Sequence, residues 1–223
     1  MNRKLIYASI LGAALYLSGA AHAQSPANTR ATQPAAATPA QVQVDLLRGL
    51  ADIFSRGLDT LGERLNRKGY TARVYSTNGW QTVSRRIAEN YTRGHKDIIV
   101  IIGHSLGGNA ALKVANALDK QNIPIELIVT FDATQPEPVT KNVLHLVNFY
   151  QENGLGKPVS AGPGFNGELT NVDLTADPNL SHVTIEKSPR LHAVVERKIE
   201  DAIKKDLAKR VQATRKNNKA KKS

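Results

Sequence analysis

The sequence contains no cysteine among its 223 residues, and this absence excludes disulfide bonds, thiolate metal sites and a cysteine nucleophile. Aromatic residues are also scarce, at 5% of the chain with one tryptophan, so the sequence offers no recognisable sugar-stacking platform. Without disulfides the fold depends on its hydrophobic core, and a chain of this length can bury one as a single domain.

Metal and nucleotide motifs are missing as well. The six histidines are scattered, and no segment resembles an H-E-x-x-H helix or an EF-hand loop. The glycine-rich stretch 103–108 lacks the lysine that a phosphate-binding loop would need. We therefore expect neither a metal ion nor a cofactor.

Long apolar runs are confined to the N-terminus. Two basic residues at 3–4 precede an apolar stretch at 5–17, and an A-x-A cleavage signature follows at 21–23. The apolar stretch is too short to span a bilayer comfortably, and no later run approaches membrane length. The sequence therefore predicts a signal peptide at 1–23, a mature protein without a transmembrane segment, and a secreted or periplasmic location.

The net charge of +11 is concentrated near the C-terminus. Residues 204–223 hold nine lysines and arginines against the single Asp206, so the rest of the chain is close to neutral. We interpret 212–223 as a basic disordered tail that contacts an anionic envelope surface electrostatically or only keeps the protein soluble. No aromatic residue is interleaved with the basic ones, so specific nucleic-acid binding is not expected. The Ala/Pro-rich stretch 24–41 predicts a disordered linker.

Between these segments, at 42–211, strand-like and helix-like patterns alternate. Strands are expected at 42–47, 72–75, 97–102, 125–131, 143–150 and 168–174, and helices at 54–68, 82–93, 107–120 and 189–210. The run 98–102 is β-branched without polar alternation, which is typical of a central parallel strand buried on both faces. This order predicts an α/β domain with a mostly parallel central sheet flanked by helices.

A G-x-S-x-G motif at 103–107 stands between a predicted buried strand and a predicted helix. In such a motif the serine occupies a strained turn that projects its Oγ above the sheet, and the glycines leave room where any Cβ would collide. The following helix directs amide N–H groups and its positive end towards the serine. Ser105 is therefore a candidate nucleophile, and an idle serine in a glycine-rich turn is the alternative.

The segment Gly-His-Ser-Leu-Gly-Gly after Ile-Ile-Val-Ile-Ile resembles the nucleophile elbow of α/β-hydrolases, particularly lipases, esterases and thioesterases. The likeness in element order covers most of 42–211, although only the elbow is sharply specific. The resemblance implies a minimal α/β-hydrolase, because the two strands that often precede the one at 42–47 would fall within 24–41. No insertion is large enough to form a separate cap domain.

The resemblance also implies the chain order serine, acid, histidine, which removes His22, His95 and His104 as catalytic bases. His145 stands within an expected strand, where a packed histidine is the more common role. The remaining candidates are His182, in the loop after the last strand where the resemblance places the base, and His192, in the first turns of the last helix.

For the acid, the resemblance favours Asp132. This residue follows the strand at 125–131, in a segment similar to the one that carries the acid in pancreatic-type lipases. Many other α/β-hydrolases place the acid one strand later, which corresponds here to Glu152. Asp173 and Asp177 are further alternatives.

The oxyanion hole that the resemblance implies consists of backbone N–H groups from Leu106 and Leu50. The expected activity is cleavage of a small-molecule or lipid ester, or of a thioester, through an acyl-Ser105 intermediate. A non-catalytic binding protein on the same scaffold and an acyltransferase are the alternatives. The Gly/Pro-rich loop 154–167 is either part of the acyl pocket or an ordinary surface loop.

Overall fold

The computed structural model describes residues 42–50 and 55–220, apart from the side chains of 219 and 220. The predicted signal peptide at 1–23 and linker at 24–41 lie outside the described residues. None of the described helices is both long enough and apolar enough to cross a membrane.

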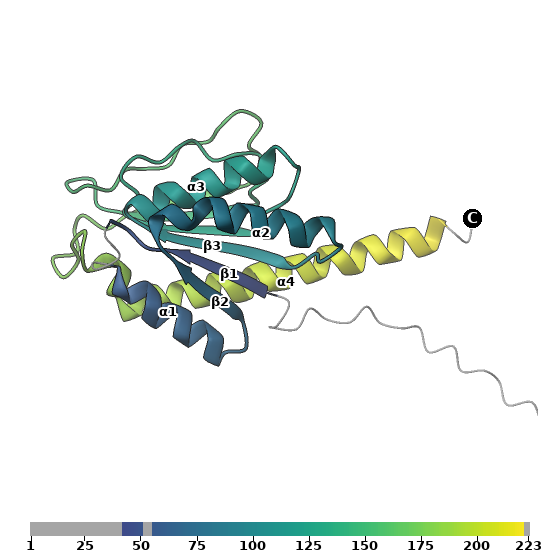
Figure 1. Cartoon of the computed structure of the whole chain (residues 1–223), viewed down its shortest axis with the longest axis horizontal. Coiled ribbons are helices and arrows are strands. Elements are labelled where there is room, and N and C mark those ends of the chain that lie inside the picture. Colours follow the sequence, from purple (N-terminus) through teal and green to yellow (C-terminus); the bar gives the residue numbers. More distant parts are fainter. Residues whose placement is uncertain (1–41, 51–54, 221–223) are drawn as a thin grey trace, which may run out of the picture. The chain divides into compact units, whose positions relative to one another are not determined.

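Six strands of the described chain form a single sheet in the order β2-β1-β3-β4-β5-β6 (Figure 1). The strands are β1 (Val42–Leu47), β2 (Thr71–Tyr75), β3 (Ile98–His104), β4 (Leu127–Phe131), β5 (His145–Tyr150) and β6 (Glu168–Asp173). Every neighbouring pair is parallel, which confirms the α/β class and sharpens the expected mostly parallel sheet. Because the strands are parallel, their carboxyl ends share one edge of the sheet, where ligand sites of such folds form.

Four α-helices cover the two faces of the sheet in the described part of the chain (Figure 1). They are α1 (Arg56–Arg67), α2 (Trp80–Thr92), α3 (Leu106–Asp119) and α4 (Pro189–Ala220), with short 3₁₀ helices at Thr77–Gly79 and Ile185–Lys187. Helices α1 and α4 lie on one face, and α2 and α3 on the other. Within the described residues the connections are single helices or loops, as expected for a minimal fold without a cap domain.

The central strand β3 supplies side chains to both cores. Val100 and Ile102 pack with α1 and α4, whereas Ile99 and Ile101 pack with α2 and α3, because successive side chains of a strand point to opposite faces. All seven residues of β3 are buried. Each isoleucine or valine side chain of β3 contributes roughly 1.5–3 kcal/mol when fully buried, so β3 fixes the base of the turn that follows it.

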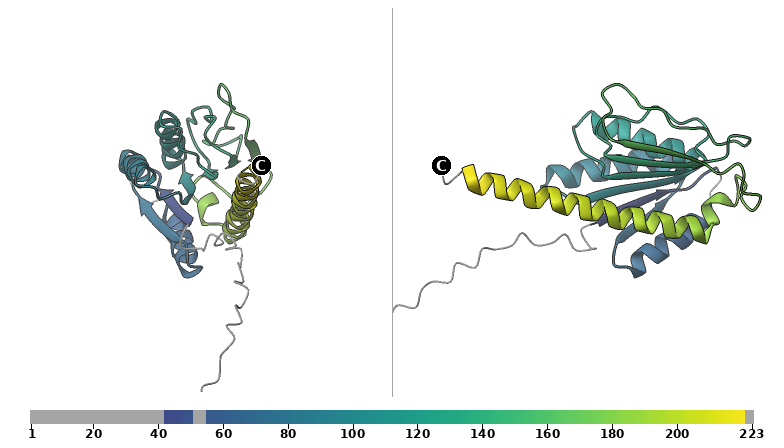
Figure 2. Two further views of the ribbon diagram at one scale, coloured as in Figure 1. Left: turned by 90° about the vertical axis from the view of Figure 1, so that its right-hand side faces the viewer. Right: turned by 180° about the vertical axis from the view of Figure 1, so that it is seen from behind.

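Helix α4 is longer than the sequence indicated. The prediction of a disordered tail from 212 is wrong for 212–220, because the helix continues to Ala220. This stretch contains neither glycine nor proline, and its alanine, lysine and arginine residues favour helix even though 212–218 are exposed. Figure 2 shows this end of α4 projecting past the strands.

The chain forms a loop rather than a helix between β5 and β6, and the amide side chains of the buried Asn148 and the exposed Asn171 hold this loop. Asn148 Nδ2 donates to the carbonyl oxygen of Lys157 (2.9 Å). The side chain of Asn171 exchanges two hydrogen bonds of 2.9 Å with the backbone of Val159. The loop is therefore fixed where it approaches the carboxyl ends of β4 and β5.

Candidate active site

Ser105 occupies the turn between β3 and α3 with φ 56° and ψ −123°, a backbone conformation that is strained for a residue with a side chain. The two motif glycines make this turn possible. A Cβ on Gly103 would lie 2.1 Å from the carbonyl oxygen of Gly107, and a Cβ on Gly107 would lie 2.0 Å from that of Leu47. The close crossing of β1, β3 and α3 therefore explains the spacing of G-x-S-x-G.

Three side chains from separate loops form a continuous chain of contacts at this turn. The Nε2 atom of His182 lies 3.0 Å from Ser105 Oγ, and its Nδ1 atom lies 2.9 Å from Asp132 Oδ2. Asp132 follows β4 with φ 49° and is fully buried. Its second oxygen, Oδ1, accepts the backbone N–H of Gln151 (2.9 Å). The carboxylate is therefore held from two sides.

The alternative histidines contact other groups. His192 is buried in α4 and its Nε2–H donates to the carbonyl oxygen of Glu186 (2.7 Å). His145 Nδ1 lies 3.1 Å from Glu168 Oε2, at the amino end of β5. The structure therefore brings His182, and neither of these two, to Ser105.

The alternative acids are also engaged elsewhere. Asp173 accepts hydrogen bonds from Thr175, and Asp177 pairs with Arg190. Glu152 has an exposed position, and its backbone N–H donates to Thr175 Oγ1 (2.8 Å). Asp132 is the candidate that reaches His182.

The two predicted oxyanion donors flank Ser105. Helix α3 begins at Leu106, and the N–H groups of a first helical turn have no acceptor within their own helix. On the other side, a Cβ on Gly49 would lie 3.1 Å from Ser105 Cβ, so the segment that contains Leu50 passes directly beside the serine. Thr77 Oγ1 holds this segment from behind by donating to the carbonyl oxygens of Arg48 and Gly49 (2.7 and 2.8 Å).

A cavity of about 300 Å³ opens above Ser105. The described part of its lining contains no lysine, arginine, aspartate or glutamate; the described lining residues are Leu50, Ser55, His104, Ser105, Leu106, Thr134, Leu155, His182 and Val183. Three leucine and valine side chains of its rim, Leu50, Leu155 and Val183, are 66%, 60% and 42% exposed, and they are the exposed large hydrophobic residues of the described chain. The exposed leucine and valine side chains therefore gather at the mouth of the cavity.

The sequence predicts no role in this site for two of its buried residues, His104 and Ser55. His104 Nδ1 lies 2.8 Å from Ser55 Oγ, and its Nε2 lies 2.7 Å from the carbonyl oxygen of His182. Burial lowers the pKa of His104 to about 4, so its ring is neutral at physiological pH. The position of His104 beside Ser105 was visible in the sequence, but its partners lie 49 and 78 residues away.

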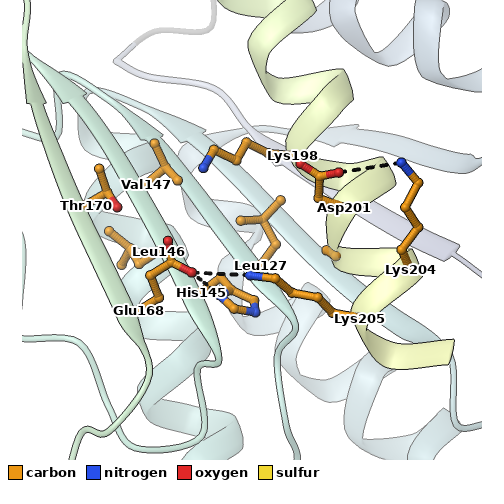
Figure 3. A pocket seen from close by; sticks show the side chains of 11 residues that line it. Leu127, His145, Leu146, Val147, Glu168, Thr170, Lys198, Asp201, Lys204 and Lys205 are labelled. Atoms are coloured by element: carbon orange, nitrogen blue, oxygen red, sulfur yellow. Dashed lines mark hydrogen bonds and ion pairs between the residues drawn. The ribbon is translucent and has the colours of Figure 1, made fainter. Parts of the chain in front are cut away.

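A second cavity of about 220 Å³ lies between α4 and the sheet, on strands β4, β5 and β6 (Figure 3). Ion pairs line it: Glu168 contacts His145 and Lys205, and Asp201 contacts Lys204. Its lining includes the first residues of β5 and β6, whereas Ser105 and Asp132 lie at the carboxyl ends of their strands. Within the described chain, no cluster of three or more potential metal ligands is present here or elsewhere.

The parallel six-stranded sheet, the strained serine turn after its central strand and the acid and histidine on later loops define the α/β-hydrolase fold in a minimal form. Solved structures share this architecture. Human thioesterase 2 matches with a TM-score of 0.51 and 12% identity, over 74% of this chain and 97% of that one.

Two further solved structures match less well. A putative hydrolase of the alpha/beta superfamily from Xanthomonas campestris has a TM-score of 0.40 and 18% identity, over 70% of this chain and 98% of that one. A cutinase-like protein from Cryptococcus sp. has a TM-score of 0.47 and 13% identity, over 73% and 95%. The sequence matches no protein-family model and no curated protein. At 12% identity, the likeness to human thioesterase 2 establishes the fold alone.

Proposed function

We propose that the protein is a serine hydrolase that cleaves a carboxylic ester or thioester through an acyl-Ser105 intermediate. The observation that carries the proposal is the chain of contacts from Asp132 through His182 to Ser105. A buried carboxylate that accepts from Nδ1–H fixes the tautomer of the imidazole and leaves the lone pair of Nε2 facing the serine. The base is then ready to accept the proton of Ser105 Oγ.

In the proposed reaction, Ser105 Oγ attacks the carbonyl carbon while its proton passes to His182 Nε2. The tetrahedral oxyanion accepts hydrogen bonds from the N–H groups of Leu106 and Leu50. His182 then donates its proton to the leaving alcohol or thiol, and the acyl-enzyme forms. A water molecule, deprotonated by His182, releases the acid and restores Ser105. Each oxyanion donor contributes about 3 kcal/mol in enzymes of this type.

The cavity supports an uncharged, apolar acyl group as the substrate part that binds beside Ser105. Among the described residues its lining has no charged carboxylate, ammonium or guanidinium group, and its rim exposes Leu50, Leu155 and Val183. Burying apolar substrate surface against these side chains stabilises the complex by about 25 cal/mol per Å² of surface removed from water. The volume of about 300 Å³ lies at the lower end of small-molecule sites, which favours a short or medium acyl chain.

The test combines a fluorophosphonate probe with p-nitrophenyl esters of short and medium chain length. Wild-type protein is expected to be labelled and to turn over the esters, and Ser105→Ala to lose both. His182→Ala should reduce turnover by about 10⁴-fold or more. His145→Ala is the matched control, because this histidine lies at the other edge of the sheet. A folded wild type that neither labels nor hydrolyses any ester would overturn the proposal and favour a binding protein.

We also propose that the protein is exported and that the basic end of α4 contacts an anionic envelope surface. Lys205, Lys209 and Arg210 contact Glu168, Glu126 and the carbonyl oxygen of Lys96. These partners stand at the amino ends of strands, so this end of α4 lies away from Ser105 and a surface held there leaves the cavity mouth free.

Export is tested by sequencing the N-terminus of the mature protein, which should begin near Gln24. Surface contact is tested with vesicles that contain anionic lipid. Retention should fall as salt rises, and an Arg215→Gln/Lys216→Gln variant should bind more weakly. Equal retention on neutral vesicles, or no retention at low salt, would refute the contact.

A further inference from the structure

A buried hydrogen-bonded path connects the two loops that flank Ser105. On one side, the backbone N–H of Gly49 donates to Ser55 Oγ (2.7 Å), and Ser55 Oγ lies 2.8 Å from His104 Nδ1. On the other side, His104 Nε2 lies 2.7 Å from the backbone oxygen of His182. Ser55 is fully buried and His104 is 1% exposed, so water does not compete for these bonds.

The direction of every bond in this path follows from the groups that form it. A carbonyl oxygen only accepts, so His104 Nε2 carries the hydrogen that reaches His182. A neutral imidazole has one N–H, so Nδ1 of His104 is an acceptor and the hydroxyl of Ser55 donates to it. A lone pair of the same hydroxyl oxygen then accepts the N–H of Gly49. The neutral ring, which burial favours by lowering the pKa of His104 to about 4, satisfies all three contacts.

The path joins the two parts of the site that must keep a fixed distance during the proposed reaction. Gly49 immediately precedes Leu50, the proposed oxyanion donor, and His182 carries the proposed base. His104 belongs to β3 and precedes Ser105 directly, so it is anchored in a strand whose residues are all buried. Its ring also contacts the ring of His182, with centroids 5.1 Å apart.

We propose that His104 and Ser55 are positioning residues that hold the oxyanion segment at Gly49–Leu50 and the base-bearing loop at His182 in register across Ser105. The role rests on the proposed serine hydrolysis and extends it to two residues without a reacting atom. Both side chains line the cavity, but their polar atoms are occupied by each other and by the two loops. They act through the backbone groups that they hold.

Ser55→Ala tests the oxyanion side of the path. The substitution removes the acceptor of the Gly49 N–H and the donor to His104 Nδ1, while the bond from His104 to His182 can persist. Because oxyanion donors act on the transition state, kcat should fall by about 10- to 100-fold with KM changed less than about threefold. The rate of fluorophosphonate labelling should fall in parallel.

The matched control is Ser84→Ala. Ser84 is also a buried serine, 7% exposed, whose hydroxyl donates to the carbonyl oxygen of Trp80 within α2. Ser84→Ala removes a buried hydroxyl, as Ser55→Ala does, but Ser84 is not part of the hydrogen-bonded path. Its kcat and labelling rate should match the wild type. An equal fall in both variants, with lowered melting temperatures, would assign the effect to general stability and overturn the proposal.

His104→Gln and His104→Phe test the His182 side of the path. The glutamine amide can still donate to the carbonyl oxygen of His182, whereas the phenylalanine ring cannot. The glutamine variant should retain more kcat than the phenylalanine variant. In a double-mutant cycle, Ser55→Ala should add less to His104→Phe than it costs alone, because both interrupt the same path. Additive losses would show that the residues act separately, which the proposal forbids.

A measurement without substrate separates this inference from the proposed function. In ¹⁵N-labelled protein, His104 should carry its proton on Nε2, and Ser55→Ala should shift the amide resonances of both Gly49 and the residues beside His182. Ser84→Ala should shift neither. If the wild type is inactive but these shifts occur, the proposed function fails while the mechanical link stands. If esters are hydrolysed but Ser55→Ala has wild-type kcat and leaves the His182 loop unshifted, the positioning role is wrong.

Discussion

Replacing Gly156 with alanine is expected to inactivate the proposed enzyme through the carboxylate of Asp132. A Cβ built on Gly156 lies 2.1 Å from Asp132 Oδ1 and 2.6 Å from its Cγ. The backbone of Gly156 does not have the positive φ that disfavours side chains, so the obstacle is the contact itself. The carboxylate or the loop must move by about 0.9 Å to reach the 3.0 Å at which real Cβ contacts begin.

The loop has little freedom to make that movement. The N–H of Lys157 donates to the carbonyl oxygen of Ala133 (2.8 Å), and the carbonyl of Lys157 accepts from Asn148 Nδ2 (2.9 Å). The Asp132 side chain therefore yields, and it leaves the Nδ1–H of His182. A displacement of about 1 Å at a catalytic group costs about 10²-fold in rate, and overpacking costs about 1–3 kcal/mol of stability.

The assay is kcat/KM for a p-nitrophenyl ester, together with the thermal unfolding midpoint. Gly154→Ala is the matched control, since a Cβ there lies 3.4 Å from its nearest neighbour, the carbonyl oxygen of Gln151, an ordinary contact. The control should retain wild-type kcat/KM. Wild-type activity in Gly156→Ala would refute the dependence on Asp132, and equal losses in both variants would assign the effect to the loop as a whole.

Three further predictions concern the acid, the cavity rim and pH. Asp132→Asn should keep the fold but lower kcat by about 10⁴-fold, measured with the same esters, because an amide in place of the carboxylate stabilises the wrong tautomer of the base; a loss below tenfold would exclude this role. Leu155→Asp should raise KM for medium-chain esters more than for acetate esters, and an equal effect on both would remove Leu155 from acyl binding. Burial raises the pKa of Glu186 to about 7, so the folded state retains a proton that the unfolded state loses. The contribution of Glu186 to stability therefore declines as pH rises from about 4.5 to 7. Glu186→Gln should remove that decline. The measurement is the unfolding free energy of the wild type minus that of the variant, which should fall as pH rises across this interval. A constant difference would contradict the prediction.

The elements that position the site were predictable because their patterns are local. The β-branched run of β3 and the G-x-S-x-G spacing indicated a buried strand and a strained turn, and both are present. The end of α4 was not predicted, because the side chains described beyond Val211, those of 212–218, are all exposed and the sequence pattern there carries no amphipathic signal. Helix propensity alone favours a helix in this stretch, whereas its polar and charged composition predicts disorder.

The choice among candidate acids shows where local patterns stop being informative. Asp132 and Glu152 both follow strands of the same sheet, so chain order allows either. What distinguishes them is three-dimensional: the turn after β4 gives Asp132 a φ of 49°, and the Gln151 N–H and the close approach of Gly156 fix its carboxylate towards His182. These partners belong to the next loop along the chain, which no pattern around Asp132 describes.

The contacts of His104 are likewise absent from the local sequence pattern, because they join residues far apart in the chain. Chain order excludes His104 as the base, and its side chain contacts His182 through the backbone rather than through the reacting nitrogen. The residue before the serine reaches both flanking loops through its hydrogen bonds with Ser55 and the backbone of His182, because the neighbouring strands β1 and β4 end at the same edge of the sheet. A buried, neutral imidazole with one donor and one acceptor can bridge two loops in a single orientation. The turn that carries Ser105 therefore also places beside it a side chain that is hydrogen-bonded to both flanking loops.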